Sequence, residues 1–166
     1  IADGADVNIY GHGRLDMNGK SDTIRRLLIT SSGATNNTTA LVNTGTGGTL
    51  TLGFAGQVLF ITPMRGYVTT LDTGSGTLAL TNDLGFSANY DGTAQINGKL
   101  DLLGVQRNFA INNGEADNDV TINAAVTNGG INLNAAGRLV LAGANTYAGL
   151  TTVSAGILRI GTDRKS

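Results

Sequence analysis

The sequence predicts an all-β fold in which short strands stack along one axis, as in a β-solenoid. Two observations carry this prediction. A motif of the form Gly-x-Leu-x-aliphatic occurs six times, and sustained helical periodicity is almost absent. The copies start at Gly13, Gly48, Gly76, Gly98, Gly137 and Gly156. Most intervals between successive copies are near one or two steps of roughly 20 residues, which is typical of solenoid repeats.

Each motif predicts a corner followed by a strand. The glycine supplies the free backbone dihedrals that a corner needs. The alternation of aliphatic and other residues has period two, so one face of the strand is buried and the other faces water. We therefore expect inward stacks formed by Leu50, Leu78, Leu100, Leu139 and Leu158.

Further strands are expected between the motifs, where short β-branched and aromatic runs alternate with turn residues. In chain order these runs are Val7–Tyr10, Ile24–Thr30, Ala40–Val42, Gln57–Thr62, Tyr67–Leu71, Ala94–Asn97, Arg107–Asn112, Val120–Ala124 and Ile131–Asn134. Turn chemistry is expected in the Asn- and Gly-rich clusters Ser31–Asn37, Thr44–Gly48 and Asn112–Asn118. Asn and Thr at the corners are expected to stack in ladders along the axis.

The composition excludes several classes of protein. Hydrophobic residues make up 40% of the chain, which argues against disorder. The net charge of −1 and the 14% of charged residues argue against a nucleic-acid partner, which would need a concentrated basic surface. There is no cysteine, so disulfides and thiolate metal sites are excluded. No apolar run approaches the roughly 20 residues of a membrane span.

A longer stretch that contains the short motif occurs twice in the sequence. Gly13–Ile24 reads GRLDMNGKSDTI and Gly98–Ile111 begins GKLDLLGVQRNFAI. No linker separates the two halves. We therefore expect residues 1–166 to form a single solenoid with two related modules, near 1–85 and 86–166.

Residues that could carry chemistry are few, and each has a structural explanation. His12 is the single histidine and lies in a predicted turn, so it cannot build a common zinc site. Asp16 and Asp101 hold equivalent outward positions in the two modules. They are expected to lie about four rungs apart, or about 20 Å, which is too far for a catalytic carboxylate pair. The oxygen-rich stretches Asp16–Asp22 and Glu115–Asp119 are expected to be turns, because they lack the full ligand pattern of a calcium loop.

The C-terminal stretch Arg138–Gly161, RLVLAGANTYAGLTTVSAGILRIG, closely resembles the autotransporter-associated β-strand repeat, also called the passenger-associated transport repeat. Leu150 departs from the pattern, in which glycine is commoner. The segment Leu15–Ile24 is similar to the LDLNG-x-x-x-T-I stretch that often precedes such repeats. In the second copy Leu103 replaces the Asn and Asn108-Phe109 replaces Thr-Ile. Positions that match the repeat are Leu139, Leu141, Gly143, Asn145, Thr146, Tyr147, Gly149, Thr151, Thr152, Val153, Gly156, Leu158, Ile160 and Gly161.

This resemblance implies a right-handed parallel β-helix in a bacterial secreted or cell-surface protein, where the repeat acts as scaffold and carries no catalytic residues. At about 20 residues per rung, the chain would form roughly eight rungs. The chain begins Ile-Ala-Asp and has no capping helix, so we expect a mature product or a segment of a longer passenger.

Three classes of function compete on these grounds. The favoured one is a non-catalytic structural module, either a passenger stalk or a self-assembling extracellular fibre subunit, with no catalytic, cofactor-binding or metal-binding residues and no cofactor. Its expected partner is a further solenoid rung at each open end, from another copy or from a longer passenger chain. The alternative is a carbohydrate-binding or adhesive β-helix that contacts surface glycans, which an exposed row of aromatic side chains would favour. A polysaccharide-cleaving enzyme would require clustered acids.

Overall fold

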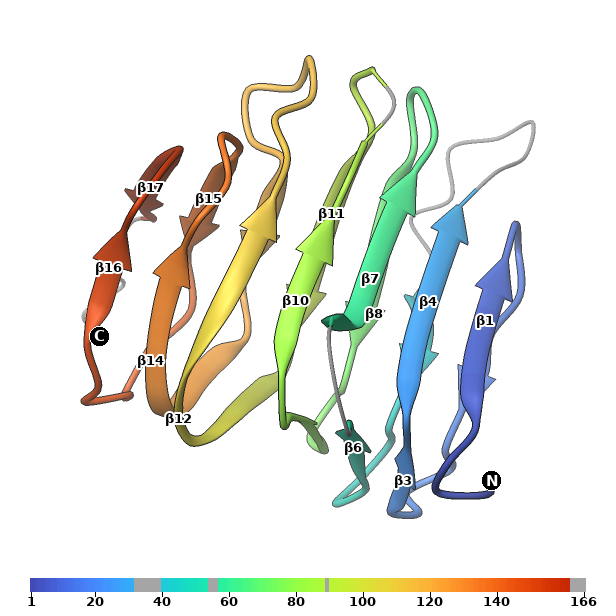
Figure 1. The fold of residues 1–166 in the computed structure, drawn as a ribbon. Coiled ribbons are helices and arrows are strands. Elements are labelled where there is room, and N and C mark those ends of the chain that lie inside the picture. Colours follow the sequence, from blue (N-terminus) through green and yellow to red (C-terminus); the bar gives the residue numbers. More distant parts are fainter. Residues whose placement is uncertain (32–39, 54–56, 89, 162–166) are drawn as a thin grey trace.

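The computed structural model describes residues 1–31, 40–53, 57–88 and 90–161, and in them the chain winds as a parallel β-helix (Figure 1). Strands on successive rungs pair in parallel. The strands at the front of Figure 1 run upward and the chain returns behind them as it advances from right to left, so the coil is right-handed. The predicted fold class is confirmed. Within the described ranges there is no helix, and hence none that could cross a membrane.

The strands form three faces. The first face contains β1 (Asp6–Tyr10), β4 (Arg26–Ser31), β7 (Gln57–Pro63), β10 (Asp83–Phe86), the second half of β12 (Lys99–Ile111), the second half of β14 (Ala125–Leu133) and β16 (Thr151–Val153). The second face contains β2 (Leu15–Asp16), β5 (Ala40–Asn43), β8 (Val68–Asp72), β11 (Thr93–Asn97), β13 (Val120–Ile122), β15 (Arg138–Leu141) and β17 (Ile157–Ile160). The third face contains β3 (Asp22–Ile24), β6 (Thr49–Leu52), β9 (Thr77–Leu80) and the first halves of β12 and β14.

The described residues form seven rungs, fewer than the roughly eight predicted, because rung length varies. Each rung visits the first, second and third face in turn, and the first two faces carry seven strands each. The first rung spans 20 residues, from Asp6 to its paired residue Arg26, which is the length that the sequence predicted. The next rung is longer and spans 32 residues, from Leu27 to its paired residue Leu59. Longer connections between strands therefore account for the missing rung.

The six glycine-led motifs lie on two different faces. The copies that begin at Gly48, Gly76 and Gly98 lead into β6, β9 and β12 on the third face. The other three copies lead into β2, β15 and β17 on the second face. The three shorter intervals between copies are therefore true rung lengths, whereas the two longest ones include a change of face. The proposed boundary near residue 85 lies inside β10, which pairs with β7 and β12 on either side.

Several strand boundaries differ from the prediction. The expected strand Ile24–Thr30 is two strands, because the chain turns a corner at Arg25 between β3 and β4. The strands expected around Leu100 and at Arg107–Asn112 are one long strand, β12, which bends from the third face to the first. Strand β10 had no sequence signal. Most of the predicted turn Ser31–Asn37 lies outside the described residues.

The core consists of side-chain columns that run along the axis. Leu50, Leu78 and Leu100 pair in register on the third face and are fully buried. On the second face Leu139 is fully buried, whereas Leu158 below it is half-buried because it lies on the last described rung. The predicted inward stacks are therefore confirmed, on two faces. A third column on the first face contains Val7, Leu27, Leu59, Leu84, Phe109, Leu133 and Val153.

Truncating a leucine in the middle of a column should destabilise the protein strongly. Leu78→Ala removes buried methyl groups between Leu50 and Leu100 and should lower the free energy of unfolding by about 2–5 kcal/mol. Leu150→Ala is the matched control, because that side chain is 69% exposed. Urea unfolding followed by circular dichroism measures both. Equal, small losses for the two variants would contradict the assigned core.

Candidate functional site

A row of Asp and Asn side chains follows the second face, at the point where each strand ends. Strand register places Asp16 beside Asn43, Asn43 beside Asp72, and Asp72 beside Asn97. Asn123 continues the row, because it follows Ile122, the partner of Ile96. We call these five residues the Asx row. Its first three members alternate carboxylate, amide and carboxylate, so no two like charges lie on neighbouring rungs.

The first three side chains of the Asx row each hold a turn. The Oδ1 atoms of Asp16, Asn43 and Asp72 each accept a hydrogen bond from the N–H two residues later, over 2.9, 3.0 and 2.8 Å. These are Asx turns, which lead the chain round the corner. The corner is tight: Gly45 has a φ of +73°, and a methyl group there would lie 2.5 Å from the backbone nitrogen of Gly19. Glycine is therefore required at that position.

Two adjoining hollows lie along the Asx row, and both are bordered by Asp16 and Asn43. The first has a volume of about 250 Å³ and is lined by Arg14, Leu15, Asp16, Asn43, Asp72 and Gly74. The second has a volume of about 390 Å³ and is lined by Asp16, Asn18, Gly19, Asn43, Gly45 and Thr46. Polar side chains, apolar carbon and bare glycine backbone thus meet on one surface.

A second polar ladder runs along the outside of the first face. The Asn108 amide donates to the Asp83 carboxylate over 3.1 Å, and the Asn132 amide donates to Asn108 Oδ1 over 2.8 Å. The Ser154 hydroxyl then donates to Asn132 Oδ1 over 2.8 Å. On the Asx row, Asn123 donates to Asn97 Oδ1 over 2.9 Å. The predicted corner ladder is confirmed at Asn97 and Asn123, whereas the ladder of Asp83, Asn108 and Asn132 lies within strands. Both ladders tie successive rungs together.

The structure separates the two aspartates that the sequence grouped. Asp16 ends β2 on the second face, and Asp101 lies in β12 on the third face, three rungs later. The predictions of equivalent strand positions and of a four-rung separation are both wrong, because the two motif copies lie on different faces and the rungs between them are longer than 20 residues. What the copies share is a local turn. Asp101 Oδ1 accepts the Leu103 N–H over 2.8 Å, as Asp16 Oδ1 accepts the Asn18 N–H, and Leu103 and Asn18 have φ of +55° and +48°.

The remaining candidates serve the fold. His12 is exposed in the turn after β1. In the stretch Glu115–Asp119, Asp119 is fully buried, and its two carboxylate oxygens accept the N–H groups of Gly114 and Arg138, each over 2.7 Å. Asp119 therefore holds a turn to the next rung. Across the described ranges, no three His, Cys, Asp or Glu side chains are grouped so that they could hold a metal ion.

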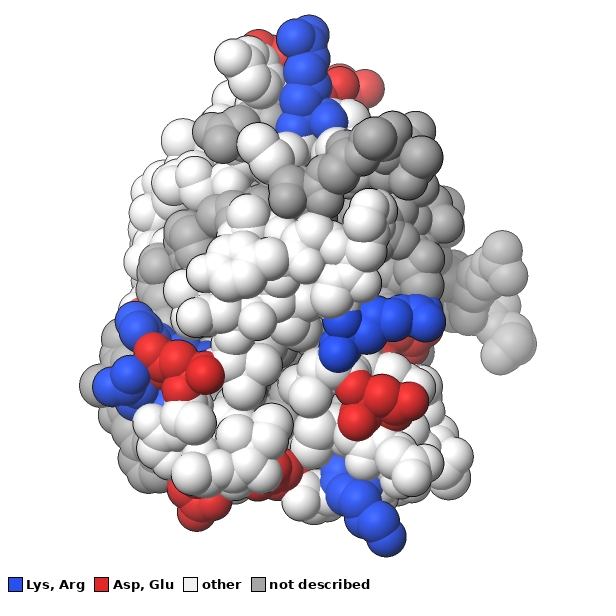
Figure 2. Space-filling model, turned by 90° about the vertical axis from the view of Figure 1, so that its right-hand side faces the viewer, with Lys and Arg blue, Asp and Glu red and all other residues white. Residues whose placement is uncertain are grey.

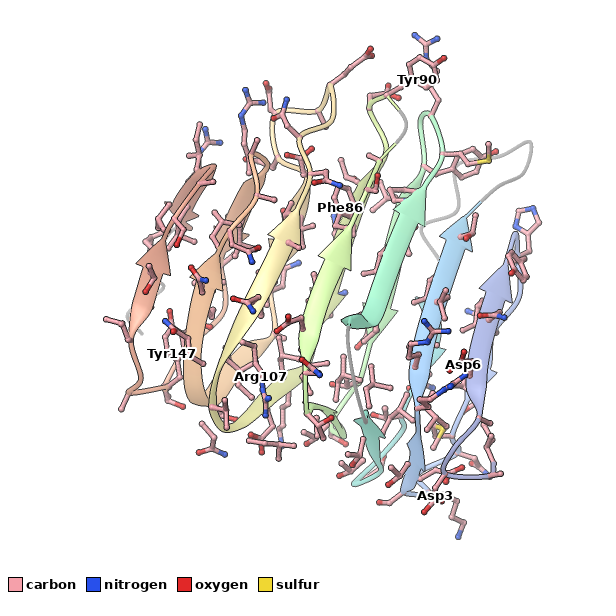
Figure 3. All side chains as sticks on the ribbon, in the orientation of Figure 1. Asp3, Asp6, Phe86, Tyr90, Arg107 and Tyr147 are labelled. Carbon is pink, nitrogen blue, oxygen red and sulfur yellow. The ribbon has the colours of Figure 1, made fainter. Side chains whose placement is uncertain are left out.

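The aromatic side chains that the structure describes are dispersed. Tyr90 is 54% exposed at one corner, where the Arg65 guanidinium lies 5.0 Å from its ring centre. Tyr147 lies near the C-terminal end of the coil, where its hydroxyl is 2.8 Å from Thr151 Oγ1 (Figure 3). Tyr10, at the end of β1, is 66% exposed. Because these three rings lie on rungs that are not adjacent, they do not form the aromatic row that would favour a stacking platform for sugars.

Sequence reasoning missed Arg107, a buried cation. It lies at the bend of β12 (Figure 3), in the inward alternation of Phe109 and Ile111. Its Nε donates to the Leu102 carbonyl over 3.1 Å, and its Nη1 donates to the Thr81 carbonyl of the previous rung. Burial lowers the pKa of Arg107. An arginine inside an otherwise apolar alternation was the available signal.

Sequence reasoning also missed Asp6, whose carboxylate connects the first two rungs. The Asp6 carboxylate accepts hydrogen bonds from the guanidinium groups of Arg25 and Arg26, which follow one rung later (Figure 3). The closest oxygen–nitrogen distances are 2.8 and 2.5 Å. Hydrogen bonds from Arg26 and then Arg25 hold the pKa of Asp6 well below its usual range.

This pKa shift predicts a pH dependence. A carboxylate with a lowered folded-state pKa stabilises the fold above the unfolded-state value of about 3.9, and that stabilisation is lost as the pH falls towards the folded-state pKa. Asp6→Asn should therefore be less stable than the wild type at neutral pH, and the difference should shrink in acid. Thermal melts across a pH series, with the exposed-residue variant Asp117→Asn as control, measure this. A difference that is constant with pH would contradict this role of Asp6.

The fold and these ladders define a parallel β-helix whose polar corners have clear structural roles. A family model of the passenger-associated-transport-repeat matches residues 136–160, from just before β15 to the end of β17, and confirms the resemblance. Repeats of this family are associated with the passenger domains of autotransporters. Comparison with curated proteins and with solved structures found no match.

Proposed function

We propose that this chain is a non-catalytic structural β-helix of a bacterial secreted or cell-surface protein, which acts as a passenger stalk or as a subunit of an extracellular fibre. The observation that carries this proposal is the combination of a regular parallel β-helix with a passenger-associated repeat at residues 136–160. Each rung contacts its neighbours, so the coil extends by adding rungs. That geometry suits a spacer.

The chemistry of the conspicuous polar residues supports a structural role. Asp16 and Asp101 each hold a turn through the N–H two residues later. Asp101 also accepts the Asn128 amide over 3.2 Å, and Asp119 joins two rungs. A hydrolase that cleaves polysaccharides needs two carboxyl groups within about 10 Å on one surface. Asp16 and Asp101 lie on different faces three rungs apart. Asp16 and Asp72 share the second face two rungs apart, which is the upper limit of that spacing, and each uses one carboxylate oxygen to hold a turn.

A cleavage assay tests the proposed lack of catalysis. The purified chain, incubated with pectin, cellulose and chitin, should release no reducing ends above a buffer blank. A variant that combines His12→Ala, Asp16→Asn and Asp101→Asn should give the same result. Release by the wild type that is lost in this variant would overturn the proposal of a non-catalytic scaffold.

The two ends of the described coil differ. On the last rung, Val153, Ile157 and Ile160 are 48%, 50% and 68% exposed. On the first rung, Ile9 and Met17 are 5% and 8% exposed. The N-terminal end is thus more closed than the sequence suggested. Viewed along the axis, it presents a mostly uncharged centre with small groups of both signs around it (Figure 2).

The exposed apolar side chains support our proposal that a further rung of the same kind covers the C-terminal end. Val153 ends the column that Val7 begins, and Ile160 ends the column that Leu15 begins. A parallel rung from a continuing passenger or from a second copy would therefore extend both columns with apolar residues. Contact of this kind between copies is head-to-tail and does not close, so it gives filaments.

Sedimentation of the 166-residue chain across a concentration series tests association between copies. The wild type should form larger species as concentration rises, because apolar side chains of β17 become buried. Ile160→Asp should suppress this, because it places a charge on the contact. Leu103→Asp is the control, since Leu103 is 43% exposed on a different corner. A wild type that remains monomeric at high concentration would refute contact between copies.

A further inference from the structure

We propose that the hollow beside Asp16, Asn43 and Asp72 is a binding site for a neutral glycan chain that lies along the helix axis. The three side chains end neighbouring strands β2, β5 and β8, so they are spaced by about 4.8 Å. The hollow of about 250 Å³ runs across all three rungs. This site goes beyond the structural role proposed above and does not depend on it.

Turn formation uses one polar atom of each side chain and leaves the other facing outward. The Oδ1 atoms accept the turn N–H groups. This fixes the orientation of the Asn43 amide, whose Oδ1 is the acceptor and whose Nδ2 is therefore the outward donor. Among the described residues, no hydrogen bond engages Oδ2 of Asp16, Nδ2 of Asn43 or Oδ2 of Asp72. The hollow thus presents an acceptor, a donor and an acceptor on successive rungs.

This alternation matches the hydroxyl groups of a sugar. A hydroxyl both donates and accepts, so neighbouring hydroxyls of one ring can donate to a carboxylate and accept from the amide on the next rung. Hydrogen bonds to the two carboxylates are charge-assisted and hence stronger than neutral ones. Successive rings of an extended glycan advance by a distance close to one rung, so the ligand and the row share their spacing.

The remaining lining fits the same class of ligand. Leu15 is half-buried and contributes apolar carbon against which the C–H face of a ring can pack. Gly74 has no side chain, which keeps the third rung of the hollow open. A sugar ring presents both hydroxyl edges and a C–H face, and this surface offers a partner for each.

Charged ligands fit less well. Asp16 and Asp72 are two rungs apart, about 10 Å, so they cannot ligate one cation together. Their negative charges disfavour phosphate and nucleic acid. Arg14 lines the same hollow and disfavours a polycation. A neutral polyhydroxylated chain is the class that remains.

The site lies outside the recognised repeat. After Asn97 and Asn123, the next position of the row is Ala142, because Ile122 pairs with Leu141. The repeat match begins at residue 136, so the Asx row ends where the repeat starts. In this chain the repeat serves as scaffold, and the rungs before it carry the recognition surface.

Isothermal titration with cellohexaose, chitohexaose and maltohexaose, together with amide NMR shifts, tests the proposal. At least one oligosaccharide should bind and shift the amides at Asp16, Asn43 and Asp72. Asp72→Asn keeps the Oδ1 turn acceptor but replaces the outward acceptor with a donor, so it should weaken binding at least about tenfold, the effect of losing one charge-assisted hydrogen bond.

Asp101→Asn is the matched control, because Asp101 forms the same turn on another face. It should bind like the wild type, and thermal melts should show that Asp72→Asn is as well folded. Binding by no oligosaccharide of the set, binding that Asp72→Asn leaves unchanged, or saturable calcium binding that shifts the same amides would each overturn the glycan site. None of these results would bear on the assembly test, which probes the opposite end of the coil.

Discussion

In-register parallel pairing between successive rungs is the constraint on which the rest of this structure depends. It places each residue above a residue of the same environment, so the column that begins at Val7 stays apolar through Val153 over seven rungs. A shift of one residue would turn a whole strand inside out. The long second rung absorbs its extra residues in connections, and the register shifts at Ala40/Val42 and Asp83/Leu84 restore the alignment.

The sequence predicted the fold class and the inward residues because period-two alternation reports directly on burial. It did not predict the faces, because a corner glycine followed by an aliphatic strand looks the same on the second face as on the third. Gly13 and Gly98 introduce similar sequences on different faces for this reason. Strand β10 was missed because it has only four residues and Gly85 has low strand propensity between its two inward residues, Leu84 and Phe86. Its pairing with β7 and β12 holds it in place.

The candidate site was harder to predict than the core, because it is assembled between rungs. Asp16, Asn43 and Asp72 are 27 and 29 residues apart, so the rung of roughly 20 residues that the sequence predicted does not connect them. The sequence analysis placed Asp16 at an outward strand position and at the start of a turn, and it missed Asn43 and Asp72. All three side chains hold turns. The row arises because parallel register brings equivalent turns together. Asx turns that repeat on neighbouring rungs therefore form an extended polar surface.

The bend of β12 shows how polar groups can hold an unfavourable corner inside this register. Leu103 replaces the Asn that the family segment has at this point, yet it adopts a left-handed φ of +55°, a conformation that costs a non-glycine residue about 1–2 kcal/mol. Two contacts hold it there: Asp101 Oδ1 accepts its N–H, and the buried Arg107 binds the carbonyl of Leu102. Arg107 also binds the Thr81 carbonyl of the rung below. The buried charge therefore couples the strained corner to its neighbour, which explains why a cation occupies a position that the alternation assigns to an apolar residue.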